Sequence, residues 1–143
     1  MACDMRISVR AAQFWMVPLK LDVIQDFGLS WMVQRLVGPS RAMQMAVFGE
    51  RVDAQTALMW GLVNEVVDDV EALSVRMHAL AHQIEEMGGD ALLMMKVILR
   101  SGERSDLASQ LNVEAIANGL AFQSGDFAQK KADYLIQTIG KTK

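Results

Sequence analysis

The second half of the sequence carries the apolar pattern that most constrains the fold. Between residues 69 and 87 the apolar side chains recur at intervals of three and four residues, the spacing that places them on one face of an α-helix. The pattern predicts one continuous helix with a buried apolar face. That face consists of Val70, Leu73, Met77, Leu80, Ile84 and Met87.

Helical spacing continues to the end of the chain. Gly88 and Gly89 are expected to end the first helix. The helices expected after it cover residues 91–99 with Asp90 as N-cap, residues 107–120 with Ser105 or Asp106 as N-cap, and residues 126–139. The sequence therefore predicts a helical region over residues 68–143.

Residues 1–67 differ, because Gly and Pro interrupt short apolar stretches there. Residues 5–9 alternate like a half-buried strand, and residues 14–17 favour a strand that stops at Pro18. Residues 62–67 are predicted as a strand or an extended exit. So few strands need neighbours. Either the later helices cover them, or a missing upstream segment or another chain does.

Short helices and a loop lie between these strands. A helix is expected after Gly38, and Gly49 stops it in a left-handed conformation. Asp53 suits the N-cap of a second helix over residues 54–60, because its carboxylate can accept hydrogen bonds from the first backbone N–H groups. Residues 21–31 are predicted as a loop.

The composition restricts the class of protein. The 143 residues are 52% hydrophobic and 22% charged, which excludes an intrinsically disordered chain. The net charge of −3 argues against a general nucleic-acid binder, and one cysteine excludes an internal disulfide framework. No segment resembles a signal peptide or approaches the roughly 18–20 apolar residues that span a bilayer. We therefore expect a cytoplasmic protein without a nucleic-acid or membrane partner.

An ordered series of motifs carries a family resemblance. Residues 49–67 resemble the pattern G-E-x-(V/I)-x-A-x-x-A-x-x-x-G-L-V-(N)-x-V-V almost position for position. The motifs before it are Ala2-Cys3-Asp4-Met5-Arg6-Ile7, Phe14, Gly28-x-Ser30-Trp31, Arg35-Leu36-Val37-Gly38 and Arg41-Ala42-Met43. The chain is identified as a member of the crotonase superfamily, the enoyl-CoA hydratase/isomerase family. It resembles only the C-terminal half of a family member.

The resemblance implies an α/β (α+β) fold that is mainly helical. Residues 1–67 would form part of a spiral of ββα units, and residues 68–143 a helical region through which family members form trimers or hexamers. It implies acyl-coenzyme A thioesters as substrates, with coenzyme A present only as part of the substrate and no other cofactor. In the family, both oxyanion-hole N–H donors lie upstream of Ala2-Cys3-Asp4. An upstream half or a partner chain must therefore supply them.

Asp26 is the acid at a catalytic position of the family. Residues 22–31 resemble the isomerase-like pattern G-x-x-P-D-x-G-G-(S/T)-W, in which the Asp shuttles a proton. Here Asp22 replaces the first Gly, Gln25 the Pro and Leu29 the second Gly. The alternative for Asp26 is a turn former, the usual role of an Asp beside a Gly in a loop.

Hydratases of the family use two glutamates, and neither is present here. One lies just before the Ala2-Cys3-Asp4 segment, and the other falls at residues 16–19, which contain no carboxylate. Adding water to a double bond needs such an acid/base pair. The resemblance therefore favours an isomerase-like double-bond shift over hydration.

Three further residues are candidate substrate contacts by the resemblance alone. Trp31 would line the acyl tunnel, Tyr134 would stack on the coenzyme A adenine of a neighbouring subunit, and Lys141 would meet a phosphate. The alternatives are a core or interface aromatic for Trp31 and a solvated basic helix end for the other two.

The two histidines, His78 and His82, stand four residues apart and would share one helix face. That spacing could hold a metal. Their face is expected to point to solvent with other charged groups, so no metal site is predicted.

Two functions of different class remain. The chain is either an acyl-CoA isomerase of the crotonase type or a catalytically inactive homologue that serves as an oligomerisation or binding module. In both cases self-association, as a homotrimer or homohexamer, is expected to bury the helix over residues 70–87 or that over residues 105–123.

Overall fold

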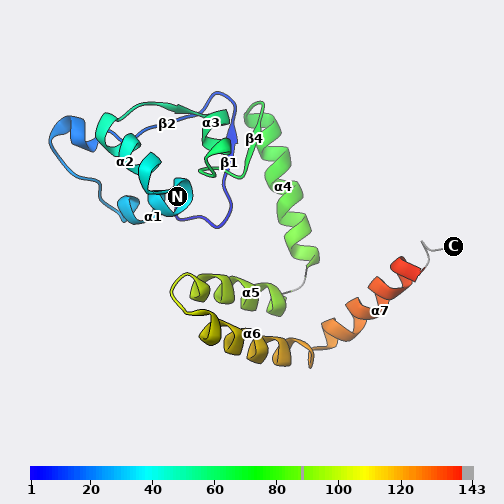
Figure 1. Ribbon diagram of the computed structural model, residues 1–143. Coiled ribbons are helices and arrows are strands. Elements are labelled where there is room, and N and C mark those ends of the chain that lie inside the picture. The colour runs from blue at the N-terminus through cyan, green and yellow to red at the C-terminus, as the bar shows by residue number, and fades with distance from the viewer. Residues whose placement is uncertain (88, 140–143) are drawn as a thin grey trace. The chain divides into compact units, whose positions relative to one another are not determined.

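The computed structural model describes residues 1–87 and 89–139. The chain divides into two compact units, Met1–Ala79 and Leu80–Lys143. The strands of the described residues all lie in the first unit, where helices form about half of the chain, and helices form most of the second unit (Figure 1). This composition confirms the predicted class, α/β and mainly helical.

Short strands pair two by two in the first unit. β1 (Ile7–Val9) lies parallel to β4 (Glu65–Val67), with the first residue of one strand opposite the first residue of the other. β2 (Gln13–Phe14) lies antiparallel to β3 (Val52–Asp53). Parallel strands need a long crossover connection, and the helices between β1 and β4 provide it.

The helices of this crossover are short. The 3₁₀-helix η1 (Pro18–Leu21) precedes α1 (Leu29–Val37), α2 (Pro39–Phe48) and α3 (Ala54–Met59). Gly38 separates α1 from α2 with a φ of 84°, a backbone conformation that glycine adopts without steric cost.

The apolar core of the first unit is formed mainly by α1, α2 and α3. Met16, which precedes η1, and residues in β3 and just before β4 complete it. Met45, Leu62 and Val33 are the largest that are fully buried. Leu29, at the start of α1, packs against this core. The complete cluster is Met16, Val33, Val37, Ala42, Met45, Val52, Ala57, Leu62 and Val63. The core therefore fixes the start of α1, where the candidate site lies.

Arg6 connects the first residues of the chain to the segment just before β4. Its Nε donates to the carbonyl of Leu62 at 2.7 Å, and its Nη1 donates to the carbonyl of Cys3 at 2.8 Å. The backbone N–H of Arg6 donates to Asn64 Oδ1 at 2.8 Å, and the N–H of Asn64 donates back to the Arg6 carbonyl at 2.7 Å. These bonds hold β1 and β4 in register.

The second unit is helical. It contains the end of α4 (Val70–Glu86), then α5 (Gly89–Gly102), α6 (Leu107–Ala121) and α7 (Gly125–Ile139). α5 and α6 pack against each other as a hairpin (Figure 1). No helix of the described residues is both long and apolar enough to cross a bilayer.

Gln110 fastens the α5–α6 hairpin. Its Nε2 donates to the carbonyl of Ile98 on α5 at 3.0 Å. Its Oε1 accepts from the hydroxyls of Ser101 at 3.0 Å and Ser105 at 2.9 Å. One side chain of α6 thus bonds to both the helix and the turn that precede it.

Two aspartates cap helices as predicted. Asp53 Oδ1 accepts from the N–H of Thr56 at 2.7 Å, and Asp106 Oδ1 accepts from the N–H of Ser109 at 2.9 Å. These backbone hydrogen bonds lower the pKa of each carboxyl below its usual value of 3.8, because they stabilise the charged form. Gly49 ends α2 with a φ of 56°, also as predicted.

Three local predictions are wrong. The loop predicted over residues 21–31 ends early, because α1 begins at Leu29 once Gly28 has turned the chain. The strand predicted over residues 14–17 stops at Phe14, and Val17 caps η1, because Pro18 starts that helix. Asp90 lies inside α5 rather than before it. Gly88, predicted to end α4 with Gly89, lies outside the described residues.

The apolar face of α4 is half-buried at Leu73 and Leu80 and exposed elsewhere, rather than buried. The helix has the predicted extent, but none of its residues, all of which the structure describes, is buried. Val70 is 73% exposed and Met77 56%. The helical spacing of α4 was predicted correctly. The prediction that its apolar face is buried was wrong for the chain taken by itself.

Candidate active site

The candidate site is built on a tight turn that leads into α1. The N–H of Leu29 donates to the carbonyl of Asp26 at 3.0 Å. The two residues between them, Phe27 and Gly28, have φ values of 50° and 72°. Two central residues with positive φ define a turn of the type I′ class. Asp26 is therefore the first residue of the turn, and α1 begins at its last.

Phe27 is the unusual member of this turn. Turns of this class favour Asn-Gly, because a residue with a Cβ is strained at positive φ. A bulky residue there is an outlier and costs about 1–2 kcal/mol. The ring offers no compensating burial, since Phe27 is 92% exposed.

The replaced glycines of the family pattern behave differently from each other. Asp22, in place of the first Gly, adopts a left-handed conformation with a φ of 56°, and Asp tolerates this region better than most residues. Leu29, in place of the second Gly, is helical and packs against the core. The loop therefore keeps a glycine-like path at Asp22 and needs no glycine at Leu29.

Asp26 is exposed to solvent. Within residues 1–87 and 89–139 no donor forms a hydrogen bond or ion pair with its side chain. An unengaged carboxylate at the first position of a rigid turn is placed to accept a proton from a molecule that approaches the turn. The preceding residue, Gln25, holds a buried Nε2 that has no partner in the described structure.

Trp31 lies on the first turn of α1, close to Asp26 in the chain. The backbone N–H of Trp31 donates to the carbonyl of Gly28 at 3.1 Å. The guanidinium of Arg35 lies 3.7 Å from the centre of its ring, and the side chain is 38% exposed. The structure thus brings Asp26 and Trp31 to one loop–helix junction, as their spacing indicates. Arg35 was missed, although four-residue spacing on a helix predicts such a contact.

The other two candidate substrate contacts lie elsewhere. Tyr134 is on α7, in the second unit, and is 68% exposed. Lys141 lies outside the described residues.

Residues 16–19, the segment where hydratases of the family are expected to carry a glutamate, contain no acid. These residues instead contribute to the core and to the start of η1. Met16 is buried in the core, and Pro18 begins η1. This segment offers no second carboxylate to pair with Asp26.

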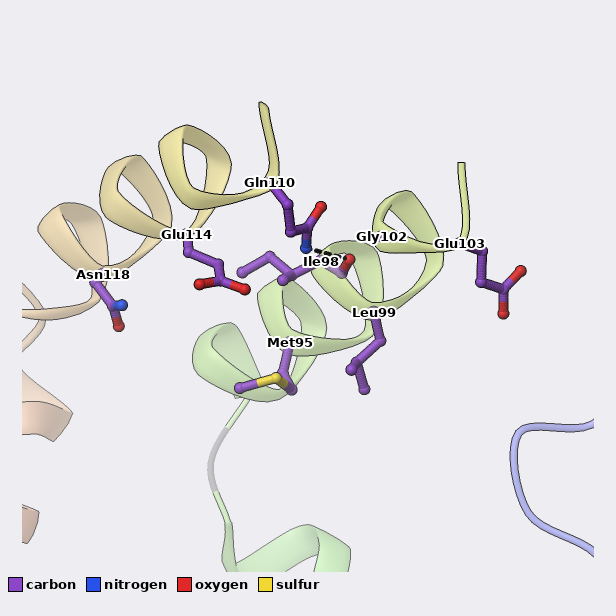
Figure 2. A pocket seen from close by; sticks show the side chains of 8 residues that line it. All are labelled: Met95, Ile98, Leu99, Gly102, Glu103, Gln110, Glu114 and Asn118. Carbon is purple, nitrogen blue, oxygen red and sulfur yellow. Dashed lines mark hydrogen bonds between the residues drawn. The ribbon is translucent and has the colours of Figure 1, made fainter. Parts of the chain in front are cut away.

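A cavity of about 600 Å³ lies between α5 and α6 (Figure 2). This cavity was not predicted from the sequence, although the α6 side chains along it recur every four residues. Its lining residues are Met95, Ile98, Leu99, Gly102, Glu103, Gln110, Glu114 and Asn118. A second cavity of about 260 Å³ in the first unit includes Trp15 and Leu29 in its wall.

The histidines of α4 make local contacts. Nδ1 of His82 lies 3.3 Å from Glu86 Oε1, and Nδ1 of His78 lies 2.7 Å from the carbonyl of Ser74. Among the residues that the structure describes, no three His, Cys, Asp or Glu side chains gather to hold a metal ion.

Comparison with solved structures defines the class of fold. The enoyl-CoA hydratase of Bacillus anthracis superposes with a TM-score of 0.89 at 28% sequence identity, over 95% of this chain and 52% of that chain. The fold is therefore that of the crotonase-type enoyl-CoA hydratases.

The chain belongs to the enoyl-CoA hydratase/isomerase family, whose model matches residues 1–135. It is 33% identical to the 1,2-epoxyphenylacetyl-CoA isomerase of Escherichia coli (strain K12), over 92% of this chain and 50% of that protein. It is 32% identical to the crotonyl-CoA hydratase of Syntrophomonas wolfei, over 88% of this chain and 48% of that protein. The chain spans about half the length of these curated relatives.

Proposed function

We propose that this chain contributes the proton-transferring half of an acyl-CoA isomerase, with Asp26 as the group that moves the proton. The observation that carries the proposal is the exposed, unengaged carboxylate of Asp26 on the turn at the start of α1. The absence of an acid at residues 16–19 favours isomerisation over hydration. One relative is named as an acyl-CoA isomerase, although another is named as a hydratase.

The double-bond shift uses one carboxylate first as a base and then as an acid. Asp26 takes a proton from C2 of a 3-enoyl thioester, and the electrons of the broken C–H bond form a dienolate that extends to the thioester oxygen. Asp26 then returns the proton to C4, which leaves the double bond between C2 and C3. General acid–base catalysis of this kind contributes about 10²–10⁴-fold to a rate.

The negative charge on the thioester oxygen needs hydrogen-bond donors. We assign these to a polypeptide half that corresponds to the part of the relatives lying outside the match, on the same chain or on a partner. In this proposal Trp31 lies beside the acyl group, and Tyr134 and Lys141 contact coenzyme A. The protein acts as a homotrimer or homohexamer in the cytoplasm.

The test measures conversion of a 3-enoyl-CoA thioester into the conjugated 2-enoyl thioester by absorbance. The Asp26→Asn variant keeps the turn and removes the base, so kcat/KM is expected to fall by about 10²-fold or more. Asp22→Asn is the matched control, because Asp22 is an exposed acid of the same loop and Asn tolerates its left-handed backbone. The control is expected to stay within about threefold of wild type. Full activity in Asp26→Asn would remove Asp26 from the mechanism.

The second candidate function is a catalytically inactive homologue that serves as an oligomerisation or binding module. The exposed apolar face of α4 favours it, since large exposed apolar patches mark interaction sites. The same assay distinguishes the two, because an inactive module gives no turnover with 3-enoyl or 2-enoyl thioesters. Light scattering of that inactive protein would then show a stable oligomer.

A further inference from the structure

An apolar segment surrounds the candidate base. We define the apolar strap as residues 21–27, whose apolar residues are all exposed. Ile24 is 83% exposed and Phe27 92%; the others are Leu21 and Val23. Isolated exposed apolar residues are common, but several within one short loop mark a surface that binds something.

The strap holds its exposed ring in a strained backbone conformation. Phe27 has a φ of 50°, where smaller or more tolerant residues are usual. Strain of this kind at a bulky residue clusters at ligand-binding positions. Neither burial within the described residues nor backbone preference explains a phenylalanine at this position of the turn, so its ring is expected to gain a contact from a bound molecule or from another polypeptide segment.

A buried polar group without a partner precedes Asp26 in the chain. Nε2 of Gln25 is buried and has no hydrogen-bond partner in the described structure, and such donors call for an explanation. The loop therefore carries an unpartnered buried donor before Asp26 and an exposed aromatic ring after it.

We propose that Phe27 is the residue that contacts the acyl chain of the thioester and sets the preferred chain length. This inference rests on the proposed function. If Asp26 exchanges protons with carbons beside the thioester, the acyl chain must pass Asp26. The Cα of Phe27 follows that of Asp26 by about 3.8 Å, so its ring is within reach of the carbons further along the chain.

The test titrates the full-length protein, as its source produces it, with coenzyme A, butanoyl-CoA and octanoyl-CoA in a calorimeter. Saturated thioesters have no double bond to shift, so the titration reports binding alone. Wild type is expected to bind octanoyl-CoA more tightly than butanoyl-CoA. Phe27→Ala is expected to weaken octanoyl-CoA binding roughly tenfold, about the worth of a few buried carbon atoms, and to change coenzyme A binding less than about twofold.

Two further variants separate the ring from the backbone strain. Phe27→Gly also removes the ring but relieves the strain, so it is expected to lose the same roughly tenfold as Phe27→Ala. Asp22→Gly relieves strain in the same loop and keeps the ring, so it is expected to bind like wild type. Unchanged octanoyl-CoA affinity in both Phe27 variants overturns the inference alone, and a changed oligomeric mass in them would then assign the ring to a protein contact. Failure of wild type to bind any thioester overturns the proposed function as well.

Discussion

The guanidinium of Arg35 lies 3.7 Å from the centre of the Trp31 ring, and Arg35 Nη1 also donates to the Trp31 carbonyl at 3.0 Å. The contact holds the indole beside the candidate site. Arg35→Ala is expected to lower the free energy of unfolding by about 0.5–1 kcal/mol, the usual worth of an exposed cation–π contact. Urea unfolding measures this change. Arg35→Lys keeps a cation and should recover part of the loss, whereas equal stability of wild type and Arg35→Ala would show that the contact contributes nothing.

Acid should weaken the helix caps. The pKa values of Asp53 and Asp106 are lowered by backbone hydrogen bonds. Their contribution to stability is therefore fully present above the unfolded-state pKa and is lost as the pH falls through the folded-state value. Asn keeps an acceptor oxygen without a titrating group. In thermal unfolding, the double variant Asp53→Asn, Asp106→Asn should lose less of its midpoint than wild type between neutral pH and pH values below 3.8. Identical acid sensitivity of the two proteins would contradict the assignment.

Gly49 should tolerate no side chain. A Cβ there would lie 2.8 Å from the Met16 carbonyl and 2.7 Å from Lys20 Cε, at a φ of 56°. Lysine can move, but the backbone carbonyl is held beside the core. Gly49→Ala is expected to cost at least about 2 kcal/mol in urea unfolding, since the left-handed conformation alone costs about 1–2 kcal/mol. Gly119→Ala is the control, because nothing lies within 4 Å of its Cβ position. It should stabilise α6 by about 0.5–1 kcal/mol.

Gln110 should contribute more to stability than an exposed glutamine that bonds along its own helix. Gln110→Leu removes one bond to the Ile98 carbonyl and two from serine hydroxyls, which together are worth about 1–3 kcal/mol. Among the residues that the structure describes, Gln129 Nε2 donates only to Asp133 Oδ1, one turn along α7. Gln129→Leu should therefore cost less than about 0.5 kcal/mol. Hydrogen exchange of the α5 amides would rise in the first variant only.

Helix ends followed from the sequence because their causes are local. An aspartate before a helix and a glycine after one act through bonds to residues three or four positions away, so Asp53 and Gly49 were assigned correctly and Asp106 was one of the two caps named. Asp90, assigned in the same way, lies inside α5. Burial of the α4 face and the extent of β2 were not assigned correctly, because both depend on what packs against them. The helix at Leu29 was missed because Gly28 marks a turn equally well before a helix or within a loop.

The candidate site was likewise predictable from the sequence only in part. The position of Asp26 was assigned from a residue pattern, and a turn at Asp26 was the alternative given for it, since an Asp beside a Gly in a loop favours turns. Positive φ at Phe27 could not be predicted, because the preferences of the residue itself oppose it. Only the surrounding chain, fixed by Leu29 on the core, imposes that conformation.

The parallel pairing of β1 with β4 has a consequence for synthesis in the cell. The bond from Arg6 to Asn64 joins residues 58 positions apart. At roughly 5–20 residues per second, β4 is translated about 3–12 s after β1. During that interval β1 lacks β4, the strand with which it pairs in the described structure, and unpaired strands are prone to join other nascent chains. The protein's yield should therefore depend on chaperones that shield the emerging polypeptide and on the speed of the ribosome over the codons in between.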